Sequence, residues 1–314
     1  DLITQELGPR TEHDIRRTLE RQIDAGRWTQ LDRQLARDAR GTGIIDLAPH
    51  RDRQPDEYHA LKIGRLRKLE ALGLAEEVGP GQWMIDDRAE ATLRELGERG
   101  DIIKRMHRAL AERGIERGSA SYVLAAESLD TPIVGRLIER GLDDELNGTA
   151  YAVVDGVDGR THHIKLPDLD AAGDSTPGSI VELRKFDDAR SQRRVALAVR
   201  SDLDIEQQIS ASGATWLDRQ NIAREPSALS DGAFGAEVRQ AMKDRADHLV
   251  EQGLAERQGQ RIVFTRNLID TLRRRELEAL GEKLATESGQ PFNRPSTGEY
   301  VAGTYRQRFA LASG

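Results

Sequence analysis

Two adjacent histidines, His162 and His163, are the most obvious candidate metal ligands, because Asp155 and Asp158 lie close to them in the sequence. Neighbouring residues of a strand point to opposite faces, so the two rings cannot easily ligate one ion. No third histidine lies nearby, and the spacing matches no zinc motif. We therefore expect no metal site, with one histidine on the sheet face and the other on the core face.

Tyr300 and Tyr305, near the chain end, carry the side chain that some enzymes use for DNA strand transfer. Neither has a base or a metal ligand beside it, so we expect aromatic residues that pack along a strand. The absence of cysteine excludes thiolate zinc sites, disulfides and cysteine nucleophiles. The segment Gly41-Thr42-Gly43 lacks the lysine and hydroxyl residue of a phosphate-binding loop. The sequence predicts no catalytic residue and no cofactor.

Basic residues are the remaining candidates for a functional site. The net charge of −7, however, argues against a protein dedicated to coating nucleic acid. The basic residues gather over residues 59–72, 99–117 and 266–275, and these clusters recur near a repeated motif. One such cluster is usually a solvated helix face, but the recurrence favours contacts with DNA phosphates, mainly by the first cluster. The candidate DNA-contacting residues are Lys62, Arg65, Arg67, Lys68, Arg273, Arg274 and Arg275.

An internal repeat organises the elements that must position these residues. Leu31-Asp32-Arg33-Gln34 recurs as Leu217-Asp218-Arg219-Gln220, and Gly73-Leu74-Ala75-Glu76 recurs as Gly253-Leu254-Ala255-Glu256. The order of the matching segments is the same in both copies, which indicates an ancestral duplication. A tryptophan stands near the start of each copy, Trp28 and Trp216, and we interpret the two as equivalent core anchors.

Each copy has the pattern of a winged helix. In the first, Leu61, Leu66, Leu69 and Leu72 lie at helical spacing, and Gly73 provides a left-handed cap. Two short strands separated by a glycine turn follow, as they do after Gly253 in the second copy. In a winged helix the capped helix can lie in the major groove and the hairpin can contact the backbone. Many such units contact only protein, so both kinds of partner stay open.

The middle of the chain has a different pattern, with about five short strands and Asp-Gly turns that favour a small β-barrel or an open sheet. No apolar run is long enough to span a membrane, and no signal peptide is evident, so we expect a cytoplasmic protein without membrane contact. The predicted α+β fold consists of a first winged-helix-like unit over 1–97, a helical connector over 98–129, a small β domain over 130–200, a second winged-helix-like unit over 201–290, and the start of a truncated C-terminal β-element over 291–314.

Several longer segments resemble one known family. They are Arg99-Gly100-Asp101-Ile102-Ile103-Lys104, residues 135–146, residues 154–162 and residues 213–219. Together they are similar, in the same order and over nearly the whole chain, to the long C-terminal region of relaxase/mobilisation nuclease proteins of proteobacterial plasmids and integrative elements. In that family an N-terminal domain nicks DNA at the transfer origin, using a tyrosine and a metal held by a His-hydrophobic-His motif. This chain lacks the motif, so no catalytic residue of the family maps onto it.

The resemblance implies a role in plasmid mobilisation by conjugation, with relaxosome proteins and a type IV secretion coupling protein as partners. We expect a non-enzymatic accessory region that binds duplex or single-stranded DNA near the transfer origin. One alternative is a protein-docking or translocation-signal module without direct DNA contact, which the acidic net charge favours. A free-standing regulator unrelated to any nuclease is a third possibility.

Overall fold

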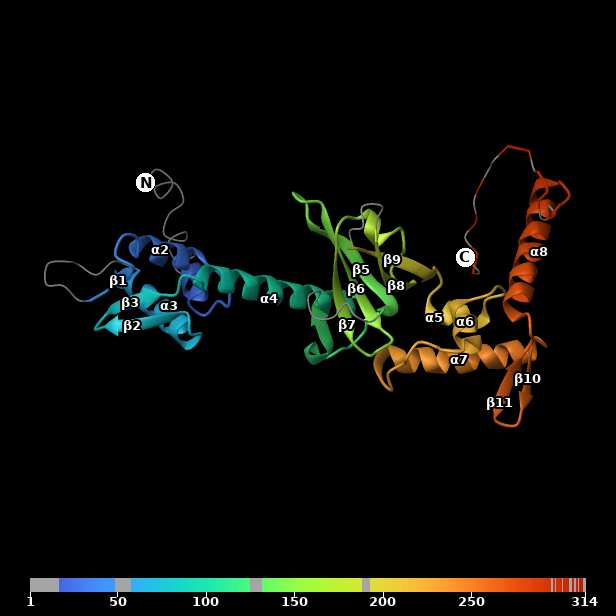
Figure 1. The fold of residues 1–314 in the computed structure, drawn as a ribbon, viewed down its shortest axis with the longest axis horizontal. Coiled ribbons are helices and arrows are strands. Elements are labelled where there is room, and N and C mark those ends of the chain that lie inside the picture. The colour runs from blue at the N-terminus through green and yellow to red at the C-terminus, as the bar shows by residue number, and fades with distance from the viewer. Residues whose placement is uncertain are drawn as a thin grey trace. The chain divides into compact units, whose positions relative to one another are not determined.

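The computed structural model describes residues 17–48, 58–124, 132–187 and 193–294, together with most of 296–312. The chain is an α+β protein that divides into two compact units, residues 1–102 and 103–314 (Figure 1). The boundary between the units falls within the long helix α4 (Ala89–Ala111). Among the described helices, none is both long enough and apolar enough to cross a membrane.

The first unit has the predicted winged-helix-like order. Its elements are a helical segment at 17–23, α2 (Gln30–Asp38), β1 (Ile44–Asp46), α3 (His59–Ala71), β2 (Ala75–Gly79), β3 (Gln82–Ile85) and the first part of α4. Gly73 adopts a φ of 70°, which ends α3, and the Leu74 amide then donates a 2.8 Å hydrogen bond to the carbonyl of Leu69. Strands β2 and β3 form the predicted wing, and β1 pairs with β3 as a third antiparallel strand.

The second unit begins with an open sheet of six strands, which decides between the two predicted forms of the β domain. The strands are β4 (Tyr122–Leu124), β5 (Val134–Asp144), β6 (Thr149–Gly156), β7 (Thr161–Leu166), β8 (Ile180–Asp187) and β9 (Arg193–Ser201). Their order is β4-β7-β6-β5-β8-β9, so β4 and β9 are edge strands and the sheet does not close into a barrel. Strand β4 runs parallel to β7, and the other neighbours are antiparallel.

The second winged-helix-like copy follows directly. It comprises α5 (Ile205–Ser210), α6 (Trp216–Ile222), α7 (Ala233–Glu251), β10 (Ala255–Gln258), β11 (Arg261–Phe264) and α8 (Leu268–Ser288). Gly253 adopts a φ of 69° after α7, as Gly73 does after α3, and β10 and β11 form the wing. The duplicated pattern of helix, glycine cap and hairpin is therefore confirmed in both copies.

One apolar cluster joins the sheet to the second copy. Val157 and Ile180 come from the sheet side, and they contact Trp216, Phe234 and other residues of α5, α6 and α7. The compact unit 103–314 thus contains both the β domain and the second winged-helix-like copy. A separate cluster on the opposite end of α7 holds the wing and the start of α8.

The predicted β-element over 291–314 is not found, because the described residues of this segment lie outside helix and strand. Phe292 instead lies against α8, where a Cβ on Gly281 would come within 2.5 Å of its ring. Tyr300 is fully exposed rather than packed, and Tyr305 lies outside the described residues. Alternating apolar residues form a strand only when they pair with another strand, and this segment pairs with none of the described strands.

Candidate nucleic-acid interface

Arg65, one of the predicted DNA contacts, is instead a core residue with no exposed side-chain surface. Its Nε and Nη2 donate to the two carboxylate oxygens of Asp32 at 2.7 and 2.9 Å. The same guanidinium donates to the backbone carbonyls of Ile23, Ala25 and Arg27. All five of its N–H groups are engaged, which is the full donor capacity of arginine. Arg65 therefore ties the chain before α2 to α3 and is unavailable to DNA.

The second copy contains the same buried pair, Arg245 and Asp218. Arg245 donates to both oxygens of Asp218 at 2.8 and 2.9 Å, and to the carbonyls of Ile209, Ala211 and Gly213. In each copy the aspartate also closes a capping box with the threonine that begins its helix. The repeat thus duplicates a buried ionic network, which is structural in both units.

The positions of the capping threonines show that the two tryptophans do not align in the repeat. Thr29 and Thr215 occupy the same position, at the start of α2 and α6. Trp28 comes before its threonine and Trp216 comes after it. The two rings are therefore not equivalent residues of the repeat, although both lie at apolar clusters.

The other cations of α3 form only a small basic surface. Lys62 is mostly buried and pairs with Asp38 at 3.0 Å. Arg67 is exposed and Lys68 half-buried, and neither side chain forms a hydrogen bond or an ion pair with the described part of the chain. The adjoining wing carries Glu76 and Glu77 and has no basic residue. The face that the sequence favoured for DNA therefore offers two free cations beside an acidic hairpin.

Helix α8 keeps its predicted basic turn exposed. Arg273, Arg274 and Arg275 are all exposed, and none forms an ion pair or a hydrogen bond with the described residues. Consecutive helical residues point about 100° apart, so the three side chains leave the helix in different directions. Leu272 and Glu276, on either side of the three, are buried against the second copy.

The charge of Arg273 acts on Arg219 of α6, as does the charge of Arg200 near the end of β9, and the sequence singled out neither Arg219 nor Arg200. Burial lowers the pKa of Arg219, and the charges of Arg273 and Arg200 lower it further. Arg200 also forms an ion pair with Glu182 of β8. We call Arg200, Arg219 and Arg273 the arginine cluster. Three elements bring like charges together here, and two carboxylates, Glu182 beside Arg200 and Asp218 beside Arg219, offset part of the repulsion.

A signal for Arg219 was present in the repeat. Both copies contain an Asp-Arg pair, Asp32-Arg33 and Asp218-Arg219, and both aspartates are completely buried. Adjacent residues of a helix point in different directions, so the arginine after a buried aspartate is directed away from the network. Arg33 is accordingly exposed and Arg219 half-exposed.

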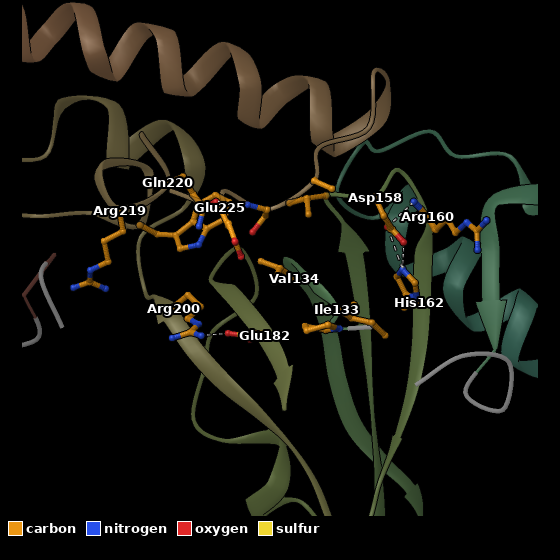
Figure 2. Close-up of a pocket in the computed structure, with 15 residues that line it drawn as sticks. Ile133, Val134, Asp158, Arg160, His162, Glu182, Arg200, Arg219, Gln220 and Glu225 are labelled. Atoms are coloured by element: carbon orange, nitrogen blue, oxygen red, sulfur yellow. Dashed lines mark hydrogen bonds and ion pairs between the residues drawn. The ribbon is translucent and has the colours of Figure 1, made fainter. Parts of the chain in front are cut away.

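A groove of about 680 Å³ adjoins the arginine cluster, between the open sheet and α6. Figure 2 shows Arg200 and Arg219 at one end and Asp158 and His162 at the other, with Val134 between them. The lining residues are Pro132, Ile133, Val134, Val157, Asp158, Arg160, His162, Glu182, Arg200, Trp216, Arg219, Gln220, Glu225, Ser227 and Ala228.

Both histidines of β7 are buried, so neither occupies an exposed sheet face as predicted. Strand β7 is an inner strand with covered faces, between β4 and β6. The Nε2 atom of His162 lies 3.0 Å from a carboxylate oxygen of Asp158. The ring of His163 stacks on Tyr151, with centroids 5.5 Å apart. No group of three potential metal ligands occurs among the described residues.

Comparison with known proteins identifies the family but not its activity. The chain belongs to a family described as protein of unknown function (DUF3363), which matches residues 62–190 and 182–314. No curated protein and no solved structure matches the chain.

Proposed function

We propose that this chain is a DNA-binding accessory region of a conjugative relaxase and acts in plasmid mobilisation at the transfer origin. The arginine cluster is the observation that carries the proposal. Arg200, Arg219 and Arg273 come from β9, α6 and α8, and the pKa of Arg219 is lowered by burial and, less strongly, by the charges of the other two. Guanidinium groups bind phosphate oxygens in a bidentate manner, and a phosphate between them relieves their mutual repulsion.

The surroundings of the cluster fit a DNA backbone. Arg274 and Arg275 add positive charge on other sides of α8, and Arg266 stands exposed just before that helix. Phosphate contacts of this kind release counterions, so binding is salt-sensitive and largely independent of sequence. We therefore assign the main DNA contact to the cations of the second unit, whereas the sequence predicted it on α3.

The proposal assigns no catalysis to this chain. The nicking chemistry of relaxases belongs, by the resemblance, to an N-terminal domain with a different motif. Relaxosome proteins and a type IV secretion coupling protein are the partners that the resemblance implies, and a cytoplasmic location accompanies them.

The test compares the wild type with the double variant R219Q/R273Q in binding to a fluorescent 20-base-pair duplex. The control variant R94Q/K283Q removes the same charge from exposed positions of α4 and α8 that form ion pairs with neighbours one helical turn away. We expect the cluster variant to bind much more weakly and the control to bind nearly as the wild type does. Equal losses in both variants would reduce the effect to net charge and contradict a specific interface.

A second candidate function is protein docking, and exposed residues of the first unit favour it. Ile44 of β1 and Met84 of β3 are cross-strand neighbours, and they are 38% and 46% exposed. Val78 on β2 is also 46% exposed, and the acidic Glu76 and Glu77 precede it. An exposed apolar surface with an acidic border is typical of a protein interface. A variant M84E that lowers plasmid transfer but leaves duplex binding unchanged would support this role for the first unit.

A further inference from the structure

The second winged-helix-like copy lacks a strand that the first copy has. In the first, β1 pairs with β3 and completes a three-stranded sheet, whereas β10 and β11 form a sheet of two among the described strands. The difference arises in the connection between two helices. Residues 39–58 join α2 to α3 and supply β1, but residues 223–232 join α6 to α7 and form no strand. The outer edge of β11 therefore has no partner among the described strands.

The shorter connection is instead held at the open sheet. The amide of Ser230 donates a 2.8 Å hydrogen bond to the carbonyl of Val157. Leu229 packs against the apolar cluster that joins the sheet to the second copy. A strand on β11 must therefore come from outside this connection.

A groove of about 510 Å³ lies beside β11, where β1 lies in the first copy. Ile45 of β1 is 1% exposed and belongs to an apolar cluster with three residues that have counterparts in the second copy. Each counterpart has a smaller side chain and lines the groove. The three pairs are Leu35 and Asn221, Leu66 and Ala246, and Trp83 and Ile262. The groove is thus the place that Ile45 fills in the first copy.

The backbone of β11 is oriented to accept a further strand. The amide of Thr265 donates to the carbonyl of Leu254 at 3.0 Å, across the pairing of β11 with β10. The hydrogen-bonding groups of successive residues alternate between the two sides of a strand, so those of Ile262 face the open edge. Trp83, the counterpart of Ile262, pairs with Ile45 in the first copy. An unpaired edge of this kind is a template for strand addition.

We propose that this edge and its groove bind an extended segment of a partner protein. The segment adds to β11 as an antiparallel strand, with an apolar residue opposite Ile262 and an acidic residue opposite Arg261. The apolar side chain fills the groove as Ile45 does in the first copy. The inference is independent of DNA binding, because no residue of the arginine cluster lines this groove.

The acidic residue of the segment follows from the charges around the groove. Arg261 and Lys243 are exposed, and neither forms an ion pair or a hydrogen bond with the described residues. In the first copy Gln82 occupies the position of Arg261, and its Nε2 atom lies 3.5 Å from a carboxylate oxygen of Asp46 on β1. A carboxylate at the place of Asp46 would therefore meet a guanidinium in the second copy.

The probe is a fluorescein-labelled peptide of residues 41–48, which contains Ile44-Ile45-Asp46. The amide of Leu47 donates to Gly81 in the first copy, so by alternation the backbone groups of Ile45 face the neighbouring strand and those of Asp46 face away. One peptide variant carries an N-methyl group on Ile45, and its matched control carries one on Asp46. We expect N-methyl-Ile45 to weaken binding to the full chain about tenfold, the effect of one lost hydrogen bond at a buried edge, and the control to bind as the unmodified peptide does.

Two protein variants identify the edge that is used. R261E places a like charge opposite Asp46 of the peptide and should weaken binding about fivefold. Q82E adds a negative charge at the corresponding position of the first copy and should leave binding unchanged. No binding of the unmodified peptide at millimolar concentration would overturn the inference. Equal effects of the two N-methyl groups, or a loss in Q82E as large as that in R261E, would also overturn it.

Discussion

The buried pair of Arg245 and Asp218 gives the sharpest stability prediction. Replacing Arg245 by methionine keeps much of the side-chain volume but removes five hydrogen bonds, two of them to the carboxylate. Asp218 then stays fully buried, and among the described residues only Thr215 still donates to its carboxyl group. Breaking a buried ion pair from one side costs about 3–5 kcal/mol, so we expect Arg245→Met to lower the free energy of unfolding of the second unit by that amount.

The expected loss of unfolding free energy has a matched control variant in the same unit. Arg257 forms an exposed ion pair with Asp247, and both side chains are more than half exposed. Arg257→Met should cost no more than about 1 kcal/mol, as exposed pairs contribute little. Arg65→Met is the counterpart in the first unit and should act on that unit alone, because its partner is Asp32.

The assay is guanidinium denaturation of the full chain, followed by tryptophan fluorescence. Trp28 and Trp83 report on the first unit and Trp216 on the second, and these are the three tryptophans of the chain. Variants W216F and W28F/W83F assign the signals. If Arg245→Met changed the stability of the second unit no more than Arg257→Met did, the buried network would not have the structural role inferred for it.

Three further predictions concern glycine, a tyrosine and catalysis. Gly97→Ala should destabilise the first unit, because its Cβ would lie 2.7 Å from Cβ of Arg27, whereas Gly100→Ala on the same helix meets no atom within 4 Å and should stabilise it by about 0.5–1 kcal/mol in thermal denaturation. Burial and the hydrogen bond to Glu139 raise the pKa of Tyr151 to about 12, above the value of 10 in an unfolded chain, so this residue contributes stability that is full below pH 10 and is lost as the pH rises through 12. The variant Y151F should remove that alkaline dependence, and an unchanged dependence in stability measurements between pH 9 and 12 would contradict it. Supercoiled plasmid should remain uncleaved by the chain with or without Mg²⁺, and metal-dependent nicking lost in His162→Ala would refute the absence of catalysis.

Local chemistry made much of the fold predictable. Gly73 and Gly253 mark the ends of α3 and α7 because a left-handed cap requires glycine, and the hairpins after them follow from short alternating strands. The segment 291–314 shows the limit of the same reasoning, since alternation does not supply a partner strand. The sheet likewise stayed ambiguous between open and closed forms, because closure depends on long-range pairing of β4 with β9.

The site was less predictable, because residue type does not reveal burial. Arg65 lies between cations on a basic helix, yet it is the one that pairs in the core. Alignment of the two copies distinguishes Arg65 from its basic neighbours. Counting back from Gly73 and Gly253, Arg65 recurs as Arg245, whereas Lys62 is replaced by Met242. The arginine cluster joins residues from β9, α6 and α8, and no sequence spacing brings these together.

The salt dependence of duplex binding reports how many phosphates the arginine cluster contacts. The association constant for a 20-base-pair duplex is measured between low and physiological salt for the wild type, R219Q/R273Q and R94Q/K283Q. Each lost phosphate contact reduces the slope of log K against log salt by about 0.9, so we expect a slope flatter by roughly two for R219Q/R273Q and an unchanged slope for the control. Identical slopes for all three proteins, or no duplex binding by the wild type at low salt, would contradict the proposed interface.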